Sequence, residues 1–124
     1  MSGVERASQR RPAGYAAPGT LPTIGGAART PNASRPTQVV ATVQIALTNG
    51  QDRTVNIQVS PDQTTAFATI ASVERATNVT GLGVSVADTT RTPVTFEVPA
   101  GGRYQFTQSG TGTATLPTIV EQTI

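Results

Sequence analysis

Residues 39–59 read VVATVQIALTNGQDRTVNIQV, and this stretch indicates the fold class. Apolar side chains occupy every second position on both sides of Asn49-Gly50, from Val39 to Leu47 and from Val55 to Val59. Because successive side chains of a strand point to opposite faces, each half is expected to be a strand with one apolar face. Asn-Gly between two such runs favours a tight turn, since both residues accept positive φ. The sequence therefore predicts an antiparallel hairpin over residues 39–59.

The same alternation recurs farther along the chain. It predicts strands over residues 82–86, 94–98 and 104–106, with turns at Asp88–Arg91 and Pro99–Gly102. Residues 113–124 could form a last strand or a tail, and Pro117 favours an edge position for it. We expect a mainly β fold: a small antiparallel β-sandwich or barrel-like body, with room for one short helix.

That helix is expected in residues 64–76, which fit two structures. Phe67, Ile70 and Ala71 lie on one helical stripe, and Ser60-Pro61 suits a helix start. The threonines of this segment lower its helix propensity. We expect a short helix here, and the alternative is another strand over residues 66–73.

The first 36 residues differ from the rest in composition and charge. They hold five arginines and one acid among many prolines and glycines, whereas residues 37–124 hold four arginines and six acids. A segment this rich in Pro and Gly shows no sustained strand or helix period. We therefore divide the chain into an extended arm, residues 1–36, and an antiparallel β domain, residues 37–124.

The arm is expected to bind a neighbouring protein subunit. Its arginines would contact acidic patches and its spaced apolar side chains would fill pockets on that subunit. The residues assigned to this contact are Arg6, Arg10, Arg11, Tyr15, Leu21, Ile24 and Arg29. Nucleic acid is not expected as the partner, because the arginines are few and only Tyr15 could stack on a base.

Composition argues against most catalytic chemistry. The chain has no Cys, no His and no Lys, so it lacks a thiol, an imidazole base, a Schiff-base amine and the soft ligands of zinc. Its three aspartates all fall at expected turns, where capping explains them. We expect no enzyme, no cofactor and no metal site. No apolar run is long enough to cross a membrane, and the first residues lack the apolar stretch of a secretory signal.

An Arg-, Pro- and Gly-rich arm followed by a Cys-free, Thr/Val-rich β body resembles the small capsid decoration (cement) proteins of tailed bacteriophages. The resemblance rests on the arm Met1–Pro36, the hairpin Val39–Val59 and the strands over Gly81–Thr107. It implies a structural virion protein on the outer capsid surface, often a trimer. Such a protein binds the major capsid protein or other virion subunits and bridges neighbouring ones through its arm.

Two other functions remain open. The first is an Ig-like adhesion module on a virion, tail or cell surface, which would bind through the turns Asp88–Arg91 and Ala100–Arg103. The second is a coat protein whose basic arm contacts packaged nucleic acid, which predicts salt-dependent binding. The body is short for an eight-stranded viral jelly roll.

Overall fold

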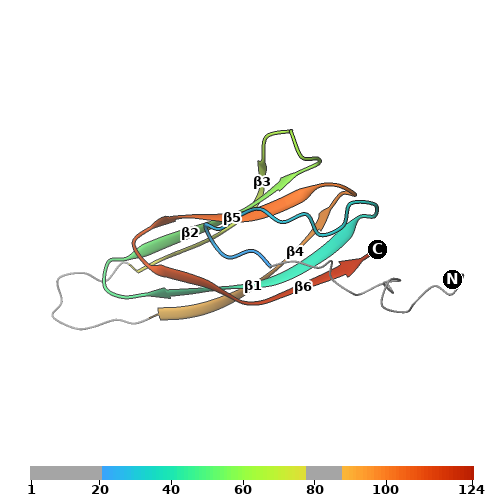
Figure 1. Ribbon diagram of the computed structural model, residues 1–124. Coiled ribbons are helices and arrows are strands. Elements are labelled where there is room, and N and C mark those ends of the chain that lie inside the picture. Colours follow the sequence, from blue (N-terminus) through green and yellow to red (C-terminus); the bar gives the residue numbers. More distant parts are fainter. Residues whose placement is uncertain (1–20, 78–87) are drawn as a thin grey trace, which may run out of the picture.

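The computed structural model describes residues 21–77 and 88–124 of the 124-residue chain. These residues form two three-stranded antiparallel sheets, ordered β4-β1-β6 and β3-β2-β5, which pack face to face (Figure 1). The strands are β1 (Thr37–Leu47), β2 (Asp52–Ser60), β3 (Ala68–Ala76), β4 (Asp88–Val98), β5 (Arg103–Gly110) and β6 (Thr113–Thr123). The predicted antiparallel β-sandwich is confirmed, and the two described ranges contain no helix.

The core lies between the two sheets and follows from the alternation in the sequence. Every odd-numbered residue of β1 from Val39 to Leu47 is buried, because these positions face the second sheet. The opposing sheet contributes Val55, Ile57, Val73, Tyr104 and Phe106, and β4 adds Phe96 and Val98. The rings of Phe96, Tyr104 and Phe106 meet edge to face, with centroids 5.4 to 6.2 Å apart. This aromatic cluster joins β4 of one sheet to β5 of the other.

The hairpin expected over residues 39–59 is wrong, although both of its strands form. β1 and β2 belong to different sheets and stack across the core rather than pairing side by side. Gly50 has a φ of 70°, but the φ of Asn49 is not positive. The two-residue turn that needs a positive φ at both positions therefore does not form. Each strand has one apolar face, and stacking lets both faces share one core. The same crossing between sheets occurs from β4 to β5 and from β5 to β6.

The short helix expected in residues 64–76 is also wrong. Residues 68–76 form β3, an edge strand paired with β2, which agrees with the strand alternative. Only Val73 of this strand is buried, so the segment shows neither a clear helical nor a clear strand period. β-branched Thr and Ile suit the extended pairing that β2 offers on this side. Ile70 is the extra residue at a bulge between the Ile57 and Gln58 pairings, which accounts for its exposed side chain.

The remaining predictions divide into three groups. The turn at Pro99–Gly102 is confirmed, with the Gly102 amide donating to the Pro99 carbonyl at 2.8 Å, and β6 is an edge strand as Pro117 suggested. The turn expected at Asp88–Arg91 is wrong, because these residues begin β4 and pair with β1. The strand expected over residues 82–86 lies outside the described residues.

Candidate functional site

Residues 21–36, the described part of the expected arm, lie along the body (Figure 1). The Gly25 amide donates to the Phe106 carbonyl at 2.7 Å, and Arg29 and Tyr104 exchange both of their backbone hydrogen bonds at 2.9 Å. The segment therefore continues the β3-β2-β5 sheet beyond β5 and covers the free edge of that strand. The domain boundary expected at residue 36 thus does not separate this segment from the β body.

A buried polar cluster fastens this segment to both sheets. The guanidinium of Arg29 binds the Glu121 carboxylate with two hydrogen bonds, 2.6 Å from Nε to Oε2 and 2.8 Å from Nη2 to Oε1. The hydroxyl of Tyr104 donates to the same Glu121 Oε2 at 2.5 Å. Arg29, Glu121 and Tyr104 are 6%, 3% and 0% exposed. Since Tyr104 belongs to β5 and Glu121 to β6, the cluster ties residue 29 to one strand of each sheet.

The cluster changes the acid–base behaviour of two of its members. The hydrogen bond from the Arg29 side chain to Glu121 is the main cause that raises the pKa of Arg29 above its usual value. Burial, followed by the hydrogen bond to Glu121, raises the pKa of Tyr104 far above that of an ordinary tyrosine. Both groups therefore keep their protons over the whole range in which proteins are usually handled. Because all three side chains are buried, a substrate cannot reach the cluster, and its role is structural.

Three of the residues assigned to partner binding can be placed. Arg29 is buried against Glu121, so the structure corrects its assignment from partner contact to internal ion pair. Ile24 is half-buried and packs against the core, which likewise removes most of it from any partner surface. Leu21 is 39% exposed and remains available. The other four, Arg6, Arg10, Arg11 and Tyr15, lie outside the described residues.

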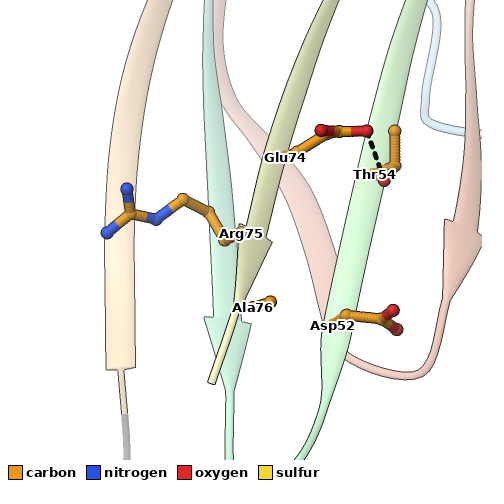
Figure 2. A pocket seen from close by; sticks show the side chains of 5 residues that line it. All are labelled: Asp52, Thr54, Glu74, Arg75 and Ala76. Carbon is orange, nitrogen blue, oxygen red and sulfur yellow. Dashed lines mark hydrogen bonds between the residues drawn. The ribbon is translucent and has the colours of Figure 1, made fainter. Parts of the chain in front are cut away.

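Two shallow hollows flank the body. One, of about 230 Å³, lies between the start of the described chain and β6 and is lined by Pro22, Thr23, Ile24, Ala114, Thr115 and Leu116. The other, of about 380 Å³, lies at the end of β2 and β3 and is lined by Asp52, Thr54, Glu74, Arg75 and Ala76. In Figure 2 the carboxylates of Asp52 and Glu74 point to one side and the guanidinium of Arg75 points to the other.

The Glu74 carboxylate and the Arg75 guanidinium of the second hollow contact residues of other strands. Glu74 accepts a long hydrogen bond of 3.5 Å from Thr54, and Arg75 lies 3.7 Å from Asp88 of β4 with both side chains partly exposed. The first contact joins the neighbouring strands β2 and β3, the second joins β3 to β4 of the other sheet, and both are weak at an exposed surface. The chain supplies no imidazole, thiol or amine to pair with these carboxylates. Within the described ranges no group of His, Cys, Asp or Glu could hold a metal ion.

The outer face of the β4-β1-β6 sheet is a regular surface of three paired strands. Paired positions form five rows across its strands: Thr89-Ala46-Thr113, Arg91-Gln44-Thr115, Pro93-Thr42-Thr118, Thr95-Val40-Val120 and Glu97-Gln38-Gln122. Val40 and Val120 are neighbours in one row and are 39% and 58% exposed. Only Arg91 and Glu97 among these fifteen side chains carry a charge. We call this set of rows the outer face.

Comparison with protein families, with curated proteins and with solved structures gives no match for this chain. In the described part of the chain, no helix is long and apolar enough to span a membrane.

Proposed function

We propose that this chain is a structural virion protein that binds the outer surface of a capsid lattice and bridges neighbouring subunits through its first twenty residues. The observation that carries the proposal is the attachment of residues 21–36 to the body. Residues 1–20 directly precede this segment, which is hydrogen-bonded to β5 and held by the buried Arg29–Glu121 pair. A tether that resists separation of two subunits must be anchored firmly at one end, and this attachment supplies such an anchor.

The charge distribution supports partner binding by residues 1–20 rather than by the body. The described residues hold six arginines and six acidic side chains, so residues 21–36 and the body together have no net charge. The first twenty residues hold Arg6, Arg10 and Arg11 against the single acid Glu5, together with the apolar Val4 and Tyr15. Because Arg29 is paired with Glu121, it is these three arginines that would contact an acidic surface of the partner. Extended segments of this kind bind by spreading a few contacts over a long path.

The same balance of arginines and acidic side chains argues against binding of nucleic acid by the body. A nucleic-acid interface needs a cluster of uncompensated Arg or Lys on one face. Arg29 is buried with Glu121, Arg53 binds the Gly112 carbonyl, and Arg75 lies beside Asp88. The adhesion alternative relied on the segments Asp88–Arg91 and Ala100–Arg103. The first is part of β4 rather than a turn, and the second ends at Arg103. That side chain stacks on Phe67, 4.5 Å from the ring centre to the guanidinium carbon, and donates to the Asp62 and Thr65 carbonyls.

The first test asks whether the chain is a particle component. Virions produced by the source of this sequence are purified on a density gradient and searched for its peptides by mass spectrometry. We expect the chain to co-migrate with intact particles in a fixed ratio to the coat protein. Its absence from particles that contain the coat protein would contradict the proposal.

The second test asks whether residues 1–20 form the bridge. Particles stripped of the chain are mixed with the full-length protein or with a variant that lacks residues 2–20. We expect the truncated protein to fold, because the buried contacts of residues 21–36 are retained. We expect it to lose most of its binding, because the residues that form the bridge are gone. The matched control is full-length Arg35→Ala, which changes one exposed arginine and should bind normally. Equal binding by truncated and full-length protein would refute the bridging role.

A further inference from the structure

The outer face of the β4-β1-β6 sheet is complementary to itself, and we infer that it binds a second copy of this chain across a two-fold axis. This surface does not include residues 1–20, so the inference holds or fails independently of the proposed function. It rests on the positions of Arg91 and Glu97 within the five rows and on the exposed side chains between them.

The two charged side chains lie at equal distances from a line between the Pro93 row and the Thr95 row. Arg91 belongs to the second row and Glu97 to the fifth, so two uncharged rows separate them on the same strand. A two-fold axis that lies in the plane of the face, between the Pro93 and Thr95 rows, exchanges the second row with the fifth. Arg91 of one copy then lies opposite Glu97 of the other, and the contact occurs twice. The spacing along β4 is about 20 Å, since a strand rises about 3.3 Å per residue.

The uncharged rows between them are complementary in the same arrangement. The axis exchanges the third row with the fourth, so that Val40 meets Thr42, Thr95 meets Pro93 and Val120 meets Thr118 of the other copy. The two exposed valines are thereby covered by the methyl groups of Thr42 and Thr118 of the other copy. Gln44 meets Gln38, and a pair of amides can donate and accept in either direction. No like charges face each other anywhere in this register.

Local contacts hold the charged side chain in place for this pairing. The Nε of Arg91 donates to the Oε1 of Gln44 at 2.7 Å, which draws the guanidinium across the face toward β1. The Thr118 hydroxyl donates to the Thr42 hydroxyl at 3.0 Å across the next row. Side chains already held over the face lose less freedom on binding. Pro93 and Pro117 interrupt the two edge strands, which favours packing of the face over pairing at its edges.

The size of the face sets the expected strength. Because the axis lies off the centre of the face, about nine of the eleven residues of each strand overlap, which gives a footprint of about 14 by 30 Å, or about 400 Å² per copy. The two copies together would bury about 800 Å², which is the size of a weak, transient interface. A reversible dimer in the micromolar range is therefore expected. A two-fold dimer also differs in mass from the trimer that the decoration-protein resemblance implies.

Charge reversal tests the pairing directly. Full-length protein and its variants are compared by sedimentation velocity over a concentration series in low salt. Arg91→Glu alone and Glu97→Arg alone each place two pairs of like charges opposite one another, and each should weaken the dimer at least about tenfold. The double variant R91E/E97R restores two opposite pairs and should recover dimerisation close to the wild-type level. The matched control is Glu74→Arg, an exposed strand glutamate on the other sheet, which should leave the dimer unchanged.

Three results would overturn the inference. The first is a wild-type chain that stays monomeric throughout the micromolar range. The second is a double variant as weak as the single variants. The third is a dimer or trimer that Val120→Asp and both single reversals leave intact, which would place the self-association elsewhere. Circular dichroism and thermal unfolding of each variant separate loss of pairing from loss of fold.

Discussion

Arg29 and Glu121 stand 92 positions apart in the sequence and form a buried, two-pronged ion pair between the segment before the first strand and the last strand. The pair closes one side of the sandwich, where the chain would otherwise expose the edge of β5. Tyr104 donates a third hydrogen bond to the same carboxylate. Three polar groups that satisfy one another in this way fix the register of residues 21–36 on the body.

Removing the arginine from this cluster should destabilise the fold strongly. In Arg29→Met the Glu121 carboxylate stays buried without its cation, and loss of one partner of a buried pair costs about 3–5 kcal/mol. We expect a fall of that size in the free energy of unfolding, measured by urea titration with circular dichroism.

The control for this variant is Arg35→Met, which removes an exposed arginine from the same segment. Arg35 donates one hydrogen bond to the Ile124 carbonyl at the surface, so its loss should cost less than about 1 kcal/mol. Adding Glu121→Gln to Arg29→Met should recover part of the lost stability, because a neutral amide is less costly to bury than an unpaired carboxylate. Equal stability of the Arg29 and Arg35 variants would show that the pair does not hold the segment.

The same cluster predicts that stability falls in alkaline solution. Burial raises the pKa of Tyr104 in the folded protein, whereas in the unfolded chain this phenol ionises near pH 10. Above pH 10 unfolding therefore releases a proton from Tyr104, and the free energy of unfolding decreases by up to about 1.4 kcal/mol per pH unit. Tyr104→Phe has no such proton, so its stability should depend less on pH between 9 and 11. Urea titrations of both proteins across that range make the comparison, and parallel curves would contradict it.

Sequence patterns predicted the strands well where the alternation was strong. β1 has an apolar residue at every odd position from Val39 to Leu47, and its buried face is the one the pattern specifies. β3 has a single buried residue, Val73, so no period identified it and propensity had to decide between helix and strand. The arrangement of strands was beyond such patterns. Asn49-Gly50 indicates a turn, but the turn does not reveal whether the two strands pair or stack.

The fate of Arg29 illustrates why a site residue can be misplaced. In the sequence it lies among Pro, Gly and Ala, where an arginine is usually exposed. The useful signal lay at the far end of the chain. Ile119, Glu121 and Thr123 occupy alternate positions of one strand face, and a carboxylate in an inward-facing position requires a buried cation. Its partner could not be chosen among nine arginines without the tertiary structure.

Acid should weaken the loop before β3 through a single carboxylate. Hydrogen bonds from the Thr65 and Thr64 amides and from the Thr65 hydroxyl lower the pKa of Asp62 to about 2. In the unfolded chain an aspartate has a pKa near 3.9, so stability from this group is complete above pH 4 and is lost as the pH falls toward 2.

Asp62→Asn tests that dependence. The amide cannot lose a proton and accepts these hydrogen bonds less strongly, so the variant should be less stable than wild type at pH 6, with the difference shrinking toward pH 2. Asp52→Asn, at the start of β2, is the control aspartate for the same measurement. Thermal unfolding by circular dichroism at each pH gives the comparison, and a constant difference between wild type and Asp62→Asn would rule out the mechanism.

The turn between β5 and β6 should require glycine for a reason that another glycine of the chain lacks. Gly110 has a φ of 106°, and a methyl group built there would lie 2.6 Å from the Asp52 carbonyl oxygen, a backbone atom that cannot rotate away. Gly25 also has a positive φ, of 79°, but a methyl group there would meet nothing within 4 Å. Gly25→Ala therefore measures the conformational penalty alone, about 1–2 kcal/mol. Gly110→Ala adds a collision between β2 and the β5–β6 turn and should lower the free energy of unfolding by clearly more than that. If both variants lose the same amount in urea titrations, the turn has room to move, and the close contact with Asp52 does not constrain the crossing from one sheet to the other.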